Sequence, residues 1–190
     1  MESIFEYYNY HKNNPGDIHE HMEAIYKLSL ECNHITEMGV RGVVTTWAFL
    51  LARPKKLISI DVMPCPVQQA AALAPKYGID FEFRMGDTGD PSFKIEPTDL
   101  LFIDTWHVYE QLKQELKLHS SYARKYIVMH DTTTFGDFRT GEQFDCYVKT
   151  GPEPKGLWPA IQEFLAENKE WVLKDRYTHC NGLTVLKRVF

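Results

Sequence analysis

Two pairs of acidic and imidazole side chains follow apolar stretches in the middle of the chain and are suited to chemistry. Asp104 is followed three residues later by His107, and His130 is followed directly by Asp131. Carboxylate oxygens suit Mg²⁺, and an imidazole in the same set suits Mn²⁺ or another transition ion. His107, with an expected pKa near neutrality, is a candidate general base for a hydroxyl proton. The pattern predicts a metal site at Asp104, His130 and Asp131 beside that base.

Each of these residues also has an ordinary structural interpretation. Asp104 could cap the helix that begins near His107, because aspartate is favoured just before the first turn of a helix. His107 could pack against its neighbours without touching a ligand. His130 and Asp131 could form a turn whose hydrogen bonds are completed by the threonines at 132–134. The sequence leaves these alternatives open.

A second candidate site is a glycine-containing turn near residue 40. A predicted strand leads into Gly39 and Gly42, a helix follows, and the next apolar run ends at Asp61. Glycines at such a turn let the backbone close on a ligand, and the later carboxylate can accept hydrogen bonds from both ribose hydroxyls. A complete G-x-G-x-x-G pattern is absent, which argues against a dinucleotide. The segment predicts a nucleoside-binding α/β domain.

The elements that must position these residues alternate between helix and strand. Apolar residues at helical spacing predict helices at 17–32, 43–52, 67–76, 107–122 and 158–168. Alternating or continuous apolar runs predict strands at 34–39, 57–60, 79–85, 99–103, 125–129, 171–178 and 183–189. Right-handed crossovers then give a Rossmann-like, doubly wound and mostly parallel seven-stranded sheet with helices on both faces. The last two strands form a C-terminal antiparallel hairpin, expected to add one antiparallel strand at the edge.

The whole chain, residues 1–190, is predicted to form a single domain. Its length suits one hydrophobic core, and no linker or repeat divides it. Residues 1–32 form an N-terminal helical segment whose aromatic start is expected to pack on a second subunit or to fold over its own pocket. Residues 132–156 are too long for a plain connection and are predicted to be an active-site lid loop.

Every predicted parallel strand ends in polar or acidic residues. In open parallel sheets, ligands bind outside the carboxyl ends of the strands, where the strand order reverses. A sheet with only a structural role needs no such concentration of carboxylates at one end. The residues that follow the five strands are Glu37 to Gly42, Asp61, Gly86 to Thr88, Asp104 to His107, and His130 to Thr132.

The order of these strand-end motifs resembles that of class I S-adenosylmethionine-dependent methyltransferases. It is most similar to the small O-methyltransferases of the cephalosporin-hydroxylase-like and metal-dependent branch, from about residue 33 to the C-terminus. In one departure, two residues separate the glycines of the first loop, whereas many members have three. The motifs are Glu37-x-Gly39-x-x-Gly42, Asp61, Gly86-Asp87, Asp104-x-x-His107 and His130-Asp131.

The resemblance implies roles for the first loop and for the second strand. Gly39 and Gly42 would let the chain pass close to the methionyl part of S-adenosylmethionine. Glu37 would hold the loop or the ammonium group of the ligand. Asp61 would accept charge-assisted hydrogen bonds from the ribose hydroxyls.

The resemblance also implies an adenine site and a metal site. Asp87, with Gly86 and Thr88 beside it, would accept a hydrogen bond from the exocyclic amine of the adenine. In the metal-dependent branch, a strand-end aspartate and an acid-plus-amide pair hold the ion. Here His130 takes the place of one of them, so Mg²⁺ or Mn²⁺ is an expected second cofactor.

The composition narrows the choice of partners. The formal net charge is −5 and the pI is about 5.9, and the basic residues are scattered, which argues against nucleic acid. No apolar run approaches the roughly 20 residues that span a bilayer. The acidic start, residues 1–6, lacks the layout of a secretion signal. The expected partner is therefore a small-molecule acceptor, with no membrane or nucleic acid, in the cytoplasm.

Several reactive residues receive no role from the sequence. The four cysteines contain no C-x-x-C pair, so they are expected to be reduced and to form no zinc cluster. His19 and His21 are expected to be solvated helix residues, since positions two apart point to different faces. Glu115 is expected to face solvent on its helix.

The predicted function is S-adenosylmethionine-dependent methyl transfer to a hydroxyl oxygen of a small molecule, such as a sugar or a polyhydroxylated metabolite, with the assistance of a divalent metal left open. One alternative is a nucleotide-dependent oxidoreductase or hydroxylase. The other is a non-catalytic protein that binds the cofactor as a sensor or as a partner subunit. A homo-oligomer is a further expectation.

Overall fold

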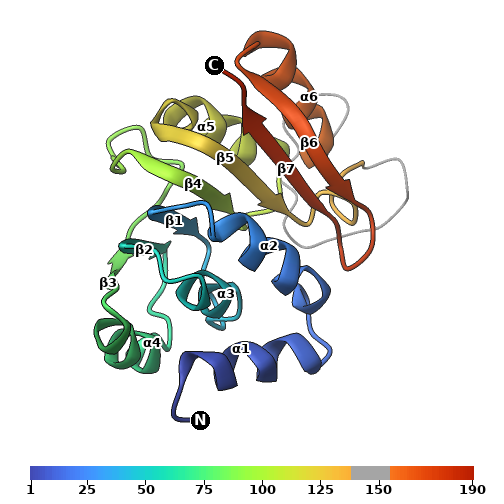
Figure 1. The fold of residues 1–190 in the computed structure, drawn as a ribbon. Helices are drawn as coiled ribbons and strands as arrows, with labels where there is room; N and C mark the ends of the chain where they lie inside the picture. The colour runs from blue at the N-terminus through green and yellow to red at the C-terminus, as the bar shows by residue number, and fades with distance from the viewer. Residues whose placement is uncertain (138–154) are drawn as a thin grey trace.

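The computed structural model describes residues 1–137 and 155–190, which form one mixed sheet with helices on both faces (Figure 1). The helices are α1 (Ile4–Asn13), α2 (Met22–Ser29), α3 (Thr45–Leu51), α4 (Gln68–Leu73), α5 (Tyr109–His119) and α6 (Leu157–Glu167). Short 3₁₀ turns lie at His19–His21, Ala74–Tyr77 and Ser120–Tyr122. The strands are β1 (His34–Met38), β2 (Lys56–Asp61), β3 (Asp80–Met85), β4 (Thr98–Ile103), β5 (Ala123–His130), β6 (Trp171–Tyr177) and β7 (Leu183–Arg188).

The seven-stranded sheet reverses its strand order beside β1. The order across the sheet is β3-β2-β1-β4-β5-β7-β6, and the strands from β3 to β5 run parallel. In this register Glu37 of β1 lies between Ser59 of β2 and Phe102 of β4. The crevice between β1 and β4 at the carboxyl ends of the strands is the place where such sheets bind ligands. The doubly wound, mostly parallel sheet predicted from the sequence is confirmed.

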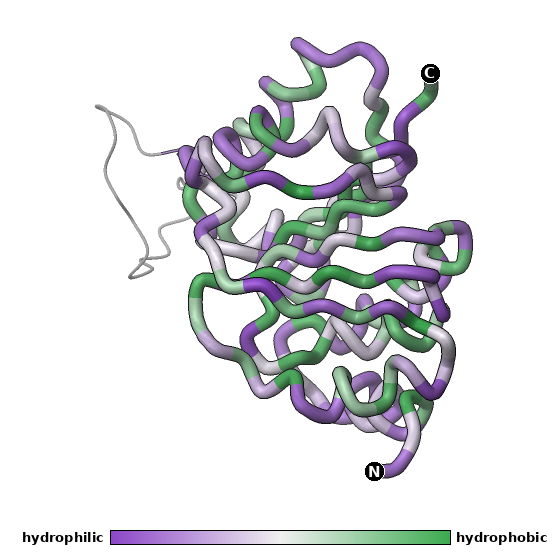
Figure 2. Tube along the Cα trace, turned by 90° about the vertical axis from the view of Figure 1, so that its left-hand side faces the viewer, coloured by the Kyte–Doolittle hydropathy of each residue, from purple (hydrophilic) through white to green (hydrophobic). Residues whose placement is uncertain are grey.

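Two hydrophobic cores lie on opposite faces of the sheet. The first includes Met22, Trp47 and Phe49 from α2 and α3, and the second includes Leu112 and Ile161 from α5 and α6. Figure 2 shows hydrophobic colour running along the inner strands and hydrophilic colour where the chain turns at the surface. Because both faces are covered, every residue of β4 is buried, as its apolar run predicted.

The N-terminal helix α1 lies within the segment 1–32 that was predicted to be helical, although its own bounds were not predicted. Its start is stabilised by a capping box, in which the Ser3 hydroxyl accepts from the Glu6 N–H and the Glu6 carboxylate accepts from the Ser3 N–H. The Tyr7 ring stacks on Trp47 of α3, with ring centroids 4.0 Å apart. The predicted helix at 17–32 is in fact a 3₁₀ turn followed by α2. The aromatic start therefore packs on its own domain.

The C-terminal hairpin enters the sheet differently from the expectation. The antiparallel strand β7 pairs with β5 on one side and with β6 on the other, so β6 forms the edge. The turn between them places Cys180 and Asn181 at positive φ, 46° and 65°, followed by Gly182 at 97°. A side chain on Gly182 would overlap Thr133, so this turn packs closely on the segment that follows β5.

The predicted lid loop, 132–156, lies mostly outside the described residues. Its two described ends are side by side, because the Leu157 and Trp158 N–H groups donate to the carbonyl oxygens of Phe135 and Gly136, at 2.8 and 3.1 Å. The two described ends of the segment therefore meet beside the start of α6.

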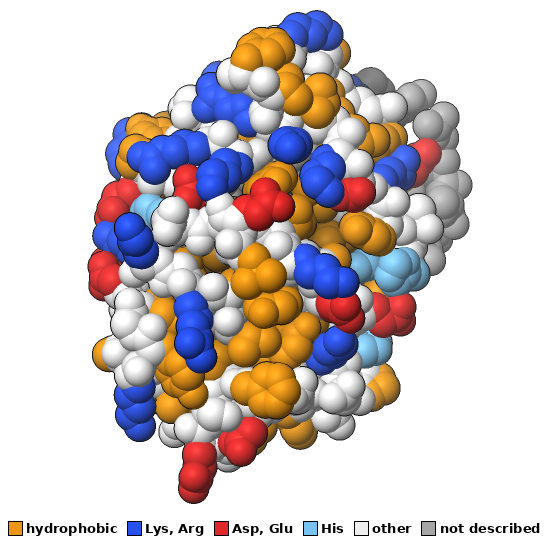
Figure 3. Space-filling view, in the orientation of Figure 1, with side chains coloured by type: hydrophobic (Ala, Val, Ile, Leu, Met, Phe, Trp, Pro, Cys, Tyr) orange, Lys and Arg blue, Asp and Glu red, His pale blue; other side chains and the backbone are white. Residues whose placement is uncertain are grey.

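The surface in the view of Figure 3 mixes basic, acidic and hydrophobic side chains. Among the described residues, no helix combines the length and the apolar character that crossing a membrane would require.

Candidate functional site

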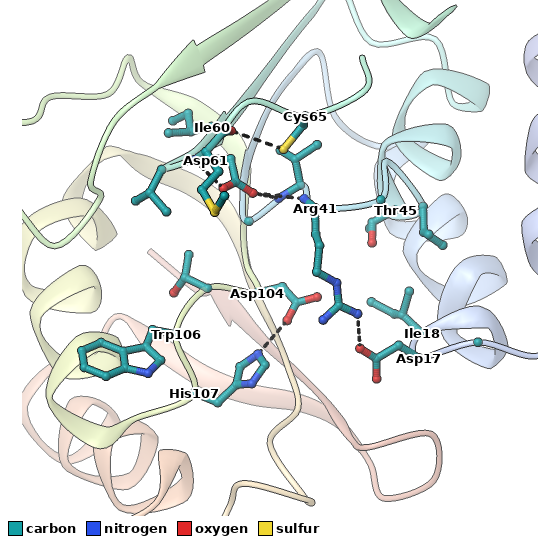
Figure 4. Close-up of a pocket in the computed structure, with 18 of the residues that line it drawn as sticks. Asp17, Ile18, Arg41, Thr45, Ile60, Asp61, Cys65, Asp104, Trp106 and His107 are labelled. Carbon is teal, nitrogen blue, oxygen red and sulfur yellow. Dashed lines mark hydrogen bonds and ion pairs between the residues drawn. The ribbon is translucent and has the colours of Figure 1, made fainter. Parts of the chain in front are cut away.

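A cavity of about 900 Å³ opens at the carboxyl ends of β1 to β4 (Figure 4). Its volume is in the range that holds a drug-sized ligand. One wall is the N-terminal segment, for which a position over the pocket was one of the two expectations. The lining residues are Gln111 of α5 and members of the segments Tyr10 to His19, Gly39 to Thr45, Ile60 to Cys65, Gly86 to Thr88 and Asp104 to His107.

Asp61, at the end of β2, organises the loop that follows β1. One carboxylate oxygen accepts from the N–H groups of Val40 and Arg41, at 2.8 and 3.0 Å, and the other accepts from Met63 N–H at 3.0 Å. Burial would raise the pKa of Asp61, but these backbone donors outweigh it and lower the pKa. Asp61 lines the cavity as predicted, and it also fixes the loop beside it.

The two glycines of this loop are not equivalent. Gly39 has a φ of 86°, and a β-carbon there would lie less than 3.0 Å from the carbonyl oxygen of Asp104. Gly42 has no positive φ, and a β-carbon there would meet only Val44, at 3.8 Å. Instead, Arg41 and Val43 adopt positive φ, 39° and 60°. Both glycines line the cavity, but only Gly39 is required by the protein's own packing.

Glu37 does not line the cavity. Its carboxyl group is buried beneath the loop, where it accepts from the hydroxyls of Thr46 at 2.8 Å and Ser59 at 2.6 Å. Burial raises its pKa to about 8, and the two hydroxyl donors only partly oppose this. Of the two predicted roles, these contacts fit the one of holding the segment after β1.

The segment after β3 is anchored to α5 by a buried carboxyl group. Thr88 donates to Glu115 at 2.5 Å, Thr105 donates to the other oxygen at 2.8 Å, and Gln111 donates at 2.9 Å. Glu115 was expected to face solvent and is instead buried, and burial raises its pKa. Asp87 is exposed on the cavity wall.

The residues predicted to carry the chemistry do come together at the ends of β4 and β5. His107 Nε2 lies 2.8 Å from a carboxylate oxygen of Asp131 and 3.3 Å from one of Asp104. Burial lowers the pKa of His107, but the two carboxylates outweigh it and raise the pKa to about 9. The expectation of a pKa near neutrality is therefore wrong, because the sequence did not show that two carboxylates share this imidazole.

A second imidazole, His130, lies behind this group. Its Nδ1 is 3.4 Å from Asp104 and 3.6 Å from Asp131, while its Nε2 faces the carbonyl oxygen of Cys180 at 3.1 Å. Burial alone would lower the pKa of His130, but Asp104 outweighs it and raises the pKa. In turn, burial raises the pKa of Asp104, and the imidazoles of His107 and His130 overcome this, so that its pKa lies well below the ordinary value.

The geometry changes the predicted set of metal ligands. Ligand atoms of Asp104, His107 and Asp131 all lie within 4.8 Å of one another, and His130 is not a member of this group. One oxygen of Asp131 is buried and has no hydrogen-bond partner among the described residues. Two carboxylates and an imidazole suit Mn²⁺ or another transition ion better than Mg²⁺. These three residues thus fit a divalent ion, with His107 in place of His130.

Solved structures with this fold include S-adenosylmethionine-dependent methyltransferases. The O-methyltransferase TomG from Streptomyces achromogenes, in complex with SAM, matches with a TM-score of 0.61 and 15% identity, over 100% of this chain and 91% of TomG. The N-methyltransferase NodS from Bradyrhizobium japonicum WM9, in complex with S-adenosyl-L-homocysteine, gives 0.59 and 16%, over 98% of each chain. The magnesium protoporphyrin IX methyltransferase ChlM from Synechocystis PCC 6803, with bound SAH, gives 0.58 and 14%, over 97% of this chain and 94% of ChlM.

The fold is therefore the Rossmann-like fold of class I S-adenosylmethionine-dependent methyltransferases, as the strand-end motifs predicted. Because both O- and N-methyltransferases share it, the fold does not select the acceptor atom. No family model matches the sequence, and no curated protein matches it.

The cavity fits a cationic nucleoside. The carboxylates of Asp61, Asp87 and Asp104 belong to its lining, and Gly39 leaves the backbone bare between Asp61 and Asp104. In Figure 4 the guanidinium of Arg41 is turned to Asp17, with which it forms an ion pair at 2.8 Å. That positive charge is therefore already paired, so the acidic wall suits a sulfonium and an ammonium group.

Proposed function

We propose that the protein is an S-adenosylmethionine-dependent methyltransferase that acts on a hydroxyl oxygen of a small molecule. The observation that carries the proposal is that Asp61, Asp87, Asp104 and His107 all line one cavity at the strand ends. A positively charged methyl donor is favoured there over a phosphate-bearing dinucleotide, because the carboxylates of Asp61 and Asp87 would repel the phosphates.

The half of the cavity beside β1 to β3 would hold the cofactor, which supplies the electrophilic methyl group. Asp61 keeps about one of its four lone-pair sites for a ribose hydroxyl after accepting from three backbone N–H groups. Asp87 would accept from the adenine amine, with Gly86 and Thr88 shaping the wall. Gly39 would let the methionyl part lie close to the backbone.

The other half, beside β4 and β5, would orient the acceptor hydroxyl. Asp104 and Asp131 hold the ring of His107 from two sides, and the neutral fraction of His107, whose pKa is raised to about 9, can take the hydroxyl proton. Alternatively, a divalent ion held by Asp104, His107 and Asp131 would make this imidazole a ligand instead of the base, and would supply Lewis acidity that lowers the pKa of the hydroxyl so that solvent can take its proton. Much of the rate would come from alignment of the oxygen with the methyl carbon.

The acceptor would be a sugar or a polyhydroxylated metabolite. The remaining wall of the cavity combines the aromatic rings of Tyr10 and Trp106 with the polar side chains of His11 and Asn14. Flat rings that pack on carbon–hydrogen faces, next to groups that donate and accept hydrogen bonds, suit such a molecule. A cytoplasmic location, a homo-oligomer, and the absence of nucleic acid and membrane partners remain predictions from the sequence.

Titration calorimetry with S-adenosylmethionine and with NAD tests the cofactor. We expect S-adenosylmethionine to bind at one site per chain and NAD to show no heat of binding. The Asp80→Asn variant, altered at an exposed carboxylate of β3 away from the cavity, is the matched control and should bind like the unaltered protein. Binding of NAD alone would reverse the proposal in favour of an oxidoreductase.

A methyl-transfer screen with hydroxyl-bearing acceptors, with chelator added and then removed, tests the reaction and the metal together. Mn²⁺ binding followed by paramagnetic resonance should weaken about 10-fold or more in Asp131→Asn. It should be unchanged in Asp80→Asn. Tight cofactor binding without turnover on any acceptor would favour a sensor or partner subunit.

A further inference from the structure

A second group of potential metal ligands lies at one end of the cavity wall, apart from the Asp104 group. Ligand atoms of His19, Glu20 and Cys180 all lie within 4.8 Å of one another. His19 and Glu20 belong to the connection between α1 and α2, and Cys180 belongs to the turn between β6 and β7. These two segments meet in Figure 1, and Figure 3 shows histidine and acidic side chains gathered at the same place.

We propose that His19, Glu20 and Cys180 bind a divalent transition-metal ion, Zn²⁺ by preference, in a structural site. A thiolate, an imidazole and a carboxylate are the three ligand types that zinc takes in proteins. The Sγ of Cys180 lies 3.8 Å from Nδ1 of His19. Two such ligands around a tetrahedral zinc ion stand about 3.6 Å apart, from the usual bond lengths. Little movement is therefore needed to bind the ion.

His179 is the candidate fourth ligand. Its Nε2 lies 3.7 Å from a carboxylate oxygen of Glu20, on the same turn as Cys180. Four protein ligands are typical of structural zinc, whereas catalytic zinc keeps an open position. A site with His179 included would be closed in this sense and would have no part in the proposed methyl transfer.

The turn that carries Cys180 is held in place by its surroundings. His21, expected to be solvated, is buried, and its Nε2 faces the carbonyl oxygens of His179 and Cys180 at 3.0 and 3.1 Å. The side-chain amide of Asn181 donates to the carboxylate of Asp17. Support of this kind around the ligands fixes their positions before the ion arrives. The positive φ of Cys180 adds to this, because such a backbone persists only when the structure enforces it.

Binding of the ion replaces contacts that Cys180 and His19 already make with the backbone. The thiol of Cys180 donates to the carbonyl oxygen of Asp17 at 3.1 Å, and Nδ1 of His19 lies 2.7 Å from that of Gly16. The thiol proton would pass to solvent, leaving a thiolate, and the imidazole would bind through Nδ1 with its proton on Nε2. No oxidant or reductant is needed.

The ion would join segments about 160 residues apart in the chain, since the Cys180 and His19 contact spans 161 positions. Gly16, Asp17 and His19 also line the cavity, so the bound ion would hold one wall of the cavity in place. Zn²⁺ at about 100 times its dissociation constant should raise the melting temperature of a chain of this size by about 5–10 °C.

The test is a cobalt titration of the full chain after treatment with a chelator. Co²⁺ should give the near-ultraviolet band of a cobalt–thiolate bond at one ion per chain, and Zn²⁺ should abolish it. Cys180→Ser should lose the band, and His19→Gln should bind about 10-fold or more weakly. Cys32→Ser is the matched control and should keep the band, because this buried thiol faces Leu28 on another side of the domain. Asp131→Asn should also keep it, since it alters only the other group.

Absence of the band in the unaltered protein, or its persistence in Cys180→Ser, would overturn the proposal. Circular dichroism of Cys180→Ser shows whether the variant is folded. If it is unfolded, His19→Gln decides between the outcomes, because this variant leaves the thiol in place and must still bind more weakly. The melting shift with Zn²⁺ should disappear in the same variants that lose cobalt binding.

Discussion

Two carboxyl groups at the ends of neighbouring strands, Glu37 in β1 and Asp104 after β4, have opposite electrostatic environments. Among the residues that the structure describes, Glu37 has only the hydroxyls of Thr46 and Ser59 as hydrogen-bond partners, and burial raises its pKa to about 8. Asp104 faces the imidazoles of His107 and His130. These overcome burial and lower its pKa. The first group is largely neutral at pH 7, and the second is ionised.

The contrast extends to the regions around the two groups. Beside β1 and β2, three backbone N–H groups hold the carboxylate of Asp61 and fix the loop, so the loop geometry is complete in the protein alone. Beside β4 and β5, charge is balanced by titratable side chains, and one oxygen of Asp131 has no hydrogen bond within the described residues. The first region is built to be rigid, and the second retains unused capacity for a ligand.

The largest effect of a substitution on stability and cofactor binding is expected at Gly39, where the two regions touch. In Gly39→Ala, the new β-carbon would overlap the carbonyl oxygen of Asp104, and alanine disfavours the φ of 86°. We expect unfolding to become easier by about 3 kcal/mol or more, and affinity for S-adenosylmethionine to fall by about 100-fold or more. Urea unfolding and titration calorimetry measure the two effects.

Gly42→Ala is the matched control for that change. Its β-carbon would meet only Val44, at 3.8 Å, and its φ is not positive. The stability should stay within about 0.5 kcal/mol of that of the unaltered protein. Equal damage by both substitutions would show that the glycines act as a pair, contrary to the packing.

The next largest effect is the pH dependence of the free energy of unfolding that the carboxyl group of Glu37 contributes. Its pKa is about 8 in the folded chain and 4.5 when unperturbed, so the folded state holds a proton that the unfolded state releases. The stabilisation is complete below pH 4.5 and is lost as the pH rises towards 8, with a slope of at most about 1.4 kcal/mol per pH unit. Glu37→Gln should remove this slope, as measured by urea unfolding at pH 5.5 and pH 8.

Glu167→Gln, at an exposed carboxyl group at the end of α6, controls for the loss of one acidic side chain. If Glu37→Gln retained the full slope of the unaltered protein, the carboxyl group of Glu37 would be ionised when folded. The contrast with Asp104 would then disappear.

A smaller effect on stability should distinguish Asp61 from Asp87, the two carboxylates proposed to bind the cofactor. Asp61→Asn removes the charge that three backbone N–H groups share, and should cost about 2 kcal/mol of stability and about 10-fold in cofactor affinity. Asp87 accepts from Gly89 N–H in its own turn. Asp87→Asn should therefore weaken cofactor binding with less than about 0.5 kcal/mol of stability lost. Equal losses of stability would show that Asp61 does not organise the loop.

The sequence predicted the sheet well because its strands are covered on both faces. The run at 99–103 is continuously apolar after its first residue, and β4 is buried along its whole length. The position of β7 between β5 and β6 was not predictable in this way, because a hairpin pattern fixes the pairing of its own strands only.

The sequence predicted the site residues that directly follow strands. It did not predict contacts that depend on packing between segments far apart in the chain. Asp61, Asp87 and Asp104 reach one cavity because parallel strands end at one edge. The wall from residues 10–19 depends on α1, whose capping box at Ser3 and Glu6 was a readable signal. The burial of Glu115 depends on threonines from two other loops, which no local pattern reveals.

The smallest effect concerns this N-terminal wall. Asp17 joins the loop after β1 to the turn between β6 and β7, since one oxygen pairs with Arg41 at 2.8 Å and the other accepts from Asn181. The Arg41 side chain is 80% exposed, so Arg41→Gln should cost less than about 0.5 kcal/mol, whereas Asp17→Ala loses both contacts and should cost about 1 kcal/mol. Urea unfolding in the presence of chelator measures both without a contribution from bound metal. A larger cost for Arg41→Gln would mean that the wall is held mainly by the loop after β1 rather than by the turn between β6 and β7.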